Sequence, residues 1–238
     1  VVYDPKDFRL IATYTAGNVT NSGLTYTIEI ADRISGDLSG YLLGNATRNP
    51  DMSLHNNIIR NKRNRGILAQ VRNSSMTNNS FENIYHGAVS ILAVYDVFHE
   101  ALVPGNIDVS GNKFLNNNQG HGLNGDVAVM VYGSEGTVTG TIRDITVINN
   151  YFYQSHLSGV SFLGAGNCLV QDNLFDHIAL DPANSSFNSA VRIFTSDHIT
   201  IQHNVTLFST LPISFDNIFL NENTQAILGI DNEVREGY

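Results

Sequence analysis

Hydrophobic and polar positions alternate along this chain in a short frame that recurs seven times. The frame runs apolar, any, apolar, any, any, Asn, and residues 145–150 are one copy. Alternation with period two places both apolar side chains on one face of a short strand. Asn suits the turn that follows, because it tolerates a left-handed backbone and bonds to nearby backbone groups. The frame ends at Asn57, Asn79, Asn112, Asn150, Asn173, Asn204 and Asn223.

The spacing of these Asn residues predicts a solenoid. Successive intervals are 22, 33, 38, 23, 31 and 19 residues, which suits one coil per frame with insertions in the longer coils. Stacked Asn side chains can also bond to the Asn above and below. We therefore expect an all-β fold, a single-stranded parallel β-helix of seven or eight coils. The strand-crossover preference favours the right-handed form.

The frame divides the chain into two parts. Residues 51–238 are expected to form the β-helix, and residues 1–50, which lack the frame, an N-terminal β insertion or edge cover. In this first part we expect strands at 24–30 and 37–43, with residues 8–14 compatible with a third. Turns are expected at 16–18 and 21–23.

A second kind of strand follows each Asn corner, at 66–70, 87–91, 127–131, 159–163, 190–194 and 226–230. Its outward residues would include Gln70, Ser90, Ser161 and Arg192. Such a row of polar side chains on a flat sheet can hold an extended saccharide, or it can simply be a solvated face.

Composition and charge narrow the function classes. The 238 residues carry a net charge of -9, which argues against a nucleic-acid partner held through phosphates. No apolar run approaches 18 residues, so no membrane-spanning helix is expected. The single Cys168 falls on an inward position and excludes an internal disulfide. The eight His show no metal-binding spacing, and no cofactor is expected.

The compartment is expected to be secreted or cell-surface. Asn18, Asn45, Asn73 and Asn184 head Asn-x-Ser/Thr sequons and would carry glycans on a secreted eukaryotic protein. Asn204 also heads a sequon but belongs to the frame, so modification there is not expected. The chain starts at Val1 without an initiator Met or an apolar signal region, which indicates a processed or truncated piece.

Candidate chemistry gathers after the second kind of strand. Asp96 and Glu100 lie in an insertion and are the best-placed carboxylates for acid–base work, with His99 and His121 nearby in sequence. Four basic residues, Arg60, Lys62, Arg63 and Arg65, fall within six positions. They are either a solvated corner or a place where guanidinium groups fork onto sugar hydroxyls or a carboxylate. Arg63, Arg65, Gln70, His99 and His121 are therefore the candidate substrate-binding residues.

These residues resemble a known family. Five motifs carry the resemblance: an Asn-Asn corner at 56–57, Arg63-x-Arg65-Gly66, Asn79-x-Phe81, Gly87-Ala88 and Phe98-x-Glu100. Together they resemble the later half of the β-helix glycosidases of glycoside hydrolase family 110, the exo-α-1,3-galactosidase type. The resemblance covers about residues 50–114. It implies the β-helix fold and an inverting hydrolysis, in which two carboxylates lie about 6.5–9.5 Å apart.

The resemblance also exposes a departure. The family's acidic pair lies upstream of the Arg-x-Arg-Gly segment, and residues 1–50 contain no adjacent Asp-Asp. Either a further N-terminal segment or chain completes the β-helix, or the protein is not catalytic. Three hypotheses stand: a hydrolase acting on an oligosaccharide or polysaccharide, with terminal α-galactosides as one candidate; a non-catalytic glycan-binding or adhesion module; and a structural β-helix of an extracellular fibre or spike.

Overall fold

Three parallel sheets make up most of the molecule. The computed structural model describes residues 1–94, 103–120, 125–132, 139–180, 189–208, 216–221 and 223–236. Sheet 1 contains β6 (Ser53–His55), β9 (Arg72–Thr77), β12 (Gly105–Ser110), β15 (Ile142–Ile148), β18 (Ala165–Gln171), β21 (Asp197–Gln202) and β24 (Gln225–Ile230). Sheet 2 contains β7 (Ile58–Lys62), β10 (Ser80–Ile84), β13 (Lys113–Leu115), β16 (Tyr151–Tyr153), β19 (Leu174–Asp176), β22 (Val205–Phe208) and β25 (Glu233–Glu236). Sheet 3 contains β8 (Ile67–Ala69), β11 (Val89–Val94), β14 (Val127–Tyr132), β17 (Val160–Leu163), β20 (Ser189–Phe194) and β23 (Asp216–Leu220).

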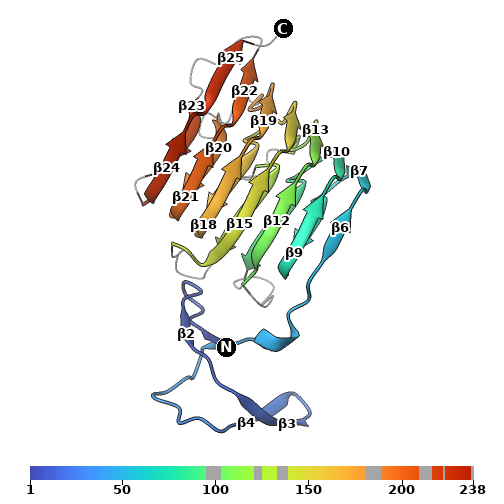
Figure 1. Cartoon of the computed structure of the whole chain (residues 1–238). Coiled ribbons are helices and arrows are strands. Elements are labelled where there is room, and N and C mark those ends of the chain that lie inside the picture. Colours follow the sequence, from blue (N-terminus) through green and yellow to red (C-terminus); the bar gives the residue numbers. More distant parts are fainter. Residues whose placement is uncertain are drawn as a thin grey trace.

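The chain visits sheets 1, 2 and 3 in turn and then returns to sheet 1, one step further along the axis. Figure 1 shows the result as strands in order of sequence colour, from β6 at one end to β24 at the other. Every neighbouring pair in these sheets is parallel, as β15 with β18 and β16 with β19 are. The all-β class and the parallel β-helix are confirmed, while the right-handed sense stays a prediction.

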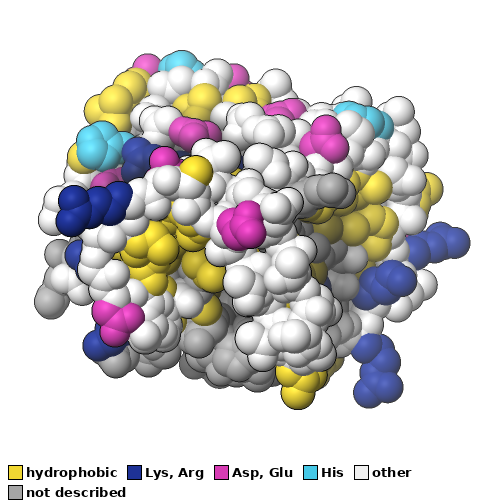
Figure 2. All heavy atoms as spheres, turned by 90° about the horizontal axis from the view of Figure 1, so that it is seen from below, with side chains coloured by type: hydrophobic (Ala, Val, Ile, Leu, Met, Phe, Trp, Pro, Cys, Tyr) yellow, Lys and Arg dark blue, Asp and Glu magenta, His cyan; other side chains and the backbone are white. Residues whose placement is uncertain are grey.

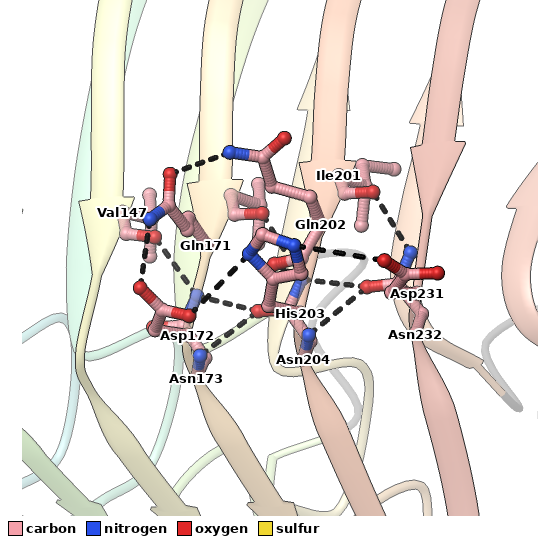
Figure 3. Close-up of polar contacts among 11 residues, drawn as sticks. Val147, Gln171, Asp172, Asn173, Ile201, Gln202, His203, Asn204, Asp231 and Asn232 are labelled. Carbon is pink, nitrogen blue, oxygen red and sulfur yellow. Dashed lines mark hydrogen bonds and ion pairs between the residues drawn. The ribbon is translucent and has the colours of Figure 1, made fainter.

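An inner ladder of Asn side chains occupies the corner between sheets 1 and 2. It consists of Asn57, Asn79, Asn112, Asn150, Asn173, Asn204 and Asn232. In each step, the backbone N–H and the Nδ2 of one Asn both donate to the Oδ1 of the next. For Asn112 and Asn150 the two distances are 2.9 and 3.0 Å. Figure 3 shows the steps from Asn173 to Asn232.

The residue before each inner-ladder Asn turns the corner. Its φ is positive in all seven coils, for Asn56, Asn78, Gly111, Asn149, Asp172, His203 and Asp231. The left-handed conformation is cheap only for Gly and for a few polar residues such as Asn and Asp. The conformational demand therefore accounts for the wealth of Asn at these corners.

The predicted position of the seventh frame is wrong. The seventh ladder residue is Asn232 and not Asn223, because residues 216–220 form β23 in sheet 3. The segment 226–230, expected to be a strand of the second kind, belongs to β24 in sheet 1. Gly229 stands where the frame expects its second apolar residue, which hid the true repeat. The last interval is 28 residues.

A column of Phe rings fills the interior beside sheet 2. Phe81, Phe114, Phe152 and Phe175 are fully buried, with successive ring centroids 5.2, 4.7 and 4.8 Å apart. Each lies two residues after an inner-ladder Asn, where the alternation predicts an inward side chain. Cys168 is also inward, and burial raises the pKa of its thiol to about 12.

The N-terminal residues form two small antiparallel units and a short 3-10 helix, Ala46–Arg48. One unit pairs β1 (Val2–Tyr3) with β2 (Leu10–Ala12) and β5 (Leu42–Leu43), and the other is a hairpin of β3 (Ala16–Ser22) and β4 (Thr25–Ile30). The strand expected at 24–30 is confirmed, but the turn expected at 16–18 is wrong because it lies inside β3. Phe8 is buried in the main core, whereas the hairpin is exposed along its length (Figure 1).

Candidate functional site

Several predicted site residues lie outside the described part of the chain. They are Asp96, His99, Glu100, His121 and the sequon residue Asn184. The predicted residues Arg63, Arg65 and Gln70 are described. Arg63 and Arg65 are exposed, and Gln70 is half-buried directly after β8.

The outer face of sheet 3 is not the solvated polar row that was expected. Ser90, Ser161 and Arg192 do lie on one cross-strand row, through Ala128, but Gln70 lies beyond the end of β8. Ser90 and Ser161 are buried. Leu92, Ala128 and Met130 form a small apolar cluster on the same strands, so apolar residues occupy much of this face.

The turn between sheets 2 and 3 places four candidate residues on two adjacent coils, and we call them the corner site: Arg63, Arg65, Tyr85 and His86. Arg63 and Arg65 follow β7, and Tyr85 and His86 follow β10 in the next coil. The coils are tied here by backbone bonds, from Tyr85 N–H to Lys62 O at 2.9 Å and from His86 N–H to Asn64 O at 3.4 Å.

Two glycines shape the corner site. A Cβ on Gly66 would lie 2.4 Å from the Ala88 carbonyl oxygen, so only glycine lets the chain after Arg65 approach the next coil. A Cβ on Gly120 would lie 2.2 Å from the Tyr85 ring, so the Gly120 backbone packs against that ring. The Gly of the Arg-x-Arg-Gly motif is therefore required by the close backbone packing of the two coils.

The Arg side chains of the corner site have no competing partners in the described structure. Arg63 and Arg65 make no hydrogen bond or ion pair with another described residue, while 48% of Tyr85 is exposed and its ring meets His86 edge-on at 5.2 Å. Figure 2 shows Lys and Arg side chains on two opposite sides of the face seen from below. Exposed guanidinium groups can bind hydroxyl or carboxylate oxygens, and an exposed aromatic ring on the next coil can bind an apolar sugar face.

A second polar column, the outer column, runs along the end of sheet 2 from the corner site. It consists of Asn61, Asn83, Asn116, Gln154 and His177, all with φ between 51 and 56°. Asn83 Nδ2 donates to Asn61 Oδ1 at 3.3 Å, and Asn116 Nδ2 donates to Asn83 Oδ1 at 2.8 Å. Beyond Asn116 the amide ladder gives way to Gln154 and His177.

Where the outer column ends, four side chains form what we call the tyrosine–aspartate cluster: Tyr151, Tyr153, Asp176 and His177. Tyr151 OH donates to Asp176 Oδ2 at 2.7 Å, and His177 Nδ1 lies 2.5 Å from Asp176 Oδ1. Burial and then the hydrogen bond to Asp176 raise the pKa of Tyr151 above its ordinary value. Sequence analysis missed this cluster, because Tyr151 and Asp176 are 25 residues apart and only the coil register joins them.

The carboxyl group of Asp126 is buried inside the solenoid. Asp126 precedes β14 and is completely buried, and Asn118 Nδ2 donates to its Oδ1 at 3.1 Å. Burial raises the pKa of Asp126 to about 7, although the hydrogen bond from Asn118 opposes the shift. Being enclosed, Asp126 is a structural group and not a contact for an extended ligand.

The described sequon residues are accessible. Asn18, Asn45 and Asn73 are exposed, and Asn204 is 2% exposed within the inner ladder. Glycosylation of the first three stays a prediction.

The described residues contain no group of three His, Cys, Asp or Glu side chains placed to hold a metal ion. Within the same residues, no helix has the length and hydropathy required to cross a bilayer.

Comparison with solved structures places the fold. The A-module of Azotobacter vinelandii mannuronan C-5 epimerase AlgE6 superposes with a TM-score of 0.52 at 14% identity, covering 79% of this chain and 54% of its own. This chain therefore spans about half the length of that module. A putative glycosyl hydrolase from Parabacteroides merdae superposes with a TM-score of 0.39 at 9% identity, over 74% of this chain and 80% of its own. No protein-family model and no curated protein matches the sequence.

The first of these likenesses supports the class of the molecule. It is a parallel β-helix protein of the architecture seen in the epimerase module.

Proposed function

We propose that this is a secreted or cell-surface, carbohydrate-active β-helix protein that binds a glycan at the corner site. The observation that carries the proposal is that Arg63 and Arg65, which are exposed and bond to no other described residue, follow β7 one coil before the half-exposed Tyr85. This combination offers polar forks for hydroxyls and an apolar surface for a sugar ring. The solenoid fixes the backbone of the corner, so the conformational entropy lost on binding is mainly that of the side chains.

The finer proposal is glycoside hydrolysis. Asp96 and Glu100 are the proposed acid and base, with Gln70, His99 and His121 as further substrate contacts. The shared fold with an enzyme named for mannuronan, a polysaccharide, supports a saccharide ligand. The family 110 resemblance around Arg63 and Arg65 supports terminal α-galactosides as the first substrates to try.

A further segment or chain that completes the β-helix is part of this proposal. Strands β6 and β7 stand last in their sheets, so one edge of each has no strand beside it in the described structure. Sheet edges of this kind accept an additional strand. An added coil would extend the surface beside Arg63 and Arg65 and could bring further carboxylates to it.

The alternative is a glycan-binding module without catalysis. It is favoured by the composition of the corner site, whose described members are two Arg, one Tyr and one His, with no carboxylate among them. These groups suffice for binding, but acid–base hydrolysis requires two carboxyl groups.

Sugar release from a panel of aryl α- and β-glycosides and oligosaccharides tests the proposal. We expect turnover by the wild-type protein, with loss of turnover but unchanged thermal unfolding in Glu100→Gln and Asp96→Asn. Full activity in both variants would remove these carboxylates from the mechanism. Glycan binding without sugar release would select the binding module, and neither binding nor release would overturn the proposed function.

A further inference from the structure

We infer that the tyrosine–aspartate cluster is a second sugar subsite, so that the ligand is a saccharide chain of several units and not a single terminal sugar. The inference rests on the proposed function, because it extends the corner site along the solenoid. It concerns the outer face of sheet 2, where no candidate residue was predicted from the sequence.

The two tyrosines form an aromatic surface. Tyr151 and Tyr153 flank the buried Phe152 on β16, so the alternation directs both away from the core. Their ring centroids are 6.0 Å apart with planes 19° apart, and the Tyr153 ring meets the His177 ring at 6.4 Å and 74°. Two nearly parallel rings beside a perpendicular imidazole make a shallow platform on which the apolar face of a pyranose can rest.

Asp176 organises the polar groups around that platform. It accepts the Tyr151 hydroxyl with one oxygen and faces His177 Nδ1 with the other. A carboxylate at Nδ1 favours the Nδ1–H tautomer, which leaves Nε2 as an acceptor for a sugar hydroxyl. The raised pKa of Tyr151 keeps its hydroxyl protonated at neutral pH, so Asp176 remains a fixed acceptor.

The outer column connects this cluster with the corner site. Asn83 and Gln154 are exposed and Asn116 is half-buried, so amide groups lie between the two places. Sheet 2 pairs β7, β10, β13, β16 and β19 in that order. At a strand spacing of about 4.8 Å, the four steps from β7 to β19 cover roughly 19 Å, which one sugar ring cannot bridge.

Because the corner site and the tyrosine–aspartate cluster are too far apart for one sugar ring, binding should depend on the length of the saccharide. Binding should be measured by calorimetry against oligosaccharide series of two to six units from glucan, galactan, mannan, xylan and uronan. The proteins are the wild type, Tyr153→Ala, Tyr153→Phe, His177→Ala and Arg65→Ala. Tyr26→Ala serves as a matched control, because 63% of Tyr26 is exposed on the N-terminal hairpin, far from both places in the sequence.

The inference predicts a length-dependent loss. Tyr153→Ala and His177→Ala should weaken binding of the longest bound members about tenfold and leave the dimers unchanged, whereas Arg65→Ala should weaken every length. Tyr153→Phe and Tyr26→Ala should bind like the wild type. If Arg65→Ala weakens binding and Tyr153→Ala does not, the second subsite is wrong and the proposed function stands. If the wild type binds no series, both are wrong.

Discussion

The molecule contains two columns of polar residues that run parallel to the solenoid axis, and they are built differently. The inner ladder is Asn in every coil, whereas the outer column changes from Asn to Gln154 and His177. Inside, each Asn must satisfy two buried backbone groups of the preceding coil and also donate to the Asn of the next coil, and only one side chain has the right donors, acceptor and length. Outside, water can satisfy any group that the column leaves unpaired. Burial therefore constrains the residue type at each position of the inner ladder, whereas the residue types of the outer column can vary and are available to bind a ligand.

Removing one Asn from the inner ladder is expected to have the largest effect on stability. Asn150→Ala leaves Asn112 N–H, one Asn112 Nδ2–H and the Val109 carbonyl without their partners, all in the interior. Each buried group left unpaired costs about 1–3 kcal/mol, so we expect a loss of about 4 kcal/mol in the free energy of unfolding. Urea denaturation measures it, and a loss below about 1 kcal/mol would contradict the structural role of the ladder.

Asp126 is a buried polar group outside the inner ladder, and its contribution to stability should depend on pH. Asp126 has a pKa of about 7 in the folded protein against 3.8 for a free carboxyl, so its proton is held more tightly when folded. The folded state is therefore favoured at low pH, and stability falls as the pH rises from about 4 to about 7. Asp126→Asn does not titrate at this position, so its free energy of unfolding should rise by about 3 kcal/mol relative to the wild type between pH 4.5 and pH 8.

Thermal unfolding of the two proteins across that pH range measures the effect. Parallel pH profiles for Asp126→Asn and the wild type would show that Asp126 titrates normally despite its burial.

The smallest effect is expected in the outer column. Asn83 donates to Asn61 at 3.3 Å and is exposed, so water replaces the bond when Asn83 is changed to Ala. The free energy of unfolding should change by less than about 1 kcal/mol, some of it from loss of the left-handed Asn. Asn83→Gly is the control that restores the backbone freedom. A loss as large as that in Asn150→Ala would erase the distinction between the two columns.

Much of the scaffold was readable from the sequence, because the inner column is under a strict demand. Six of the seven ladder residues were predicted, and the seventh was missed because Gly229 stands where the frame expects an apolar residue. The candidate sites were harder to find. Arg63 and Arg65 stood out as a local charge run, but Tyr85 and Asp176 become meaningful only when coils of unequal length are stacked in register. The outer face of sheet 3 was mistaken for a polar surface, because period alone does not show which faces are buried.

The most direct test of the central claim is one glycan-array experiment on the double variant Arg63→Ala, Arg65→Ala beside the wild type. Both proteins should first give superimposable urea unfolding curves, because the two exposed Arg side chains make no hydrogen bond or ion pair with another described residue. The account predicts that the wild type binds a set of glycans and that the double variant loses at least about tenfold in affinity for all of them. Equal binding by both proteins, or no binding by the wild type, would contradict a saccharide site at this corner.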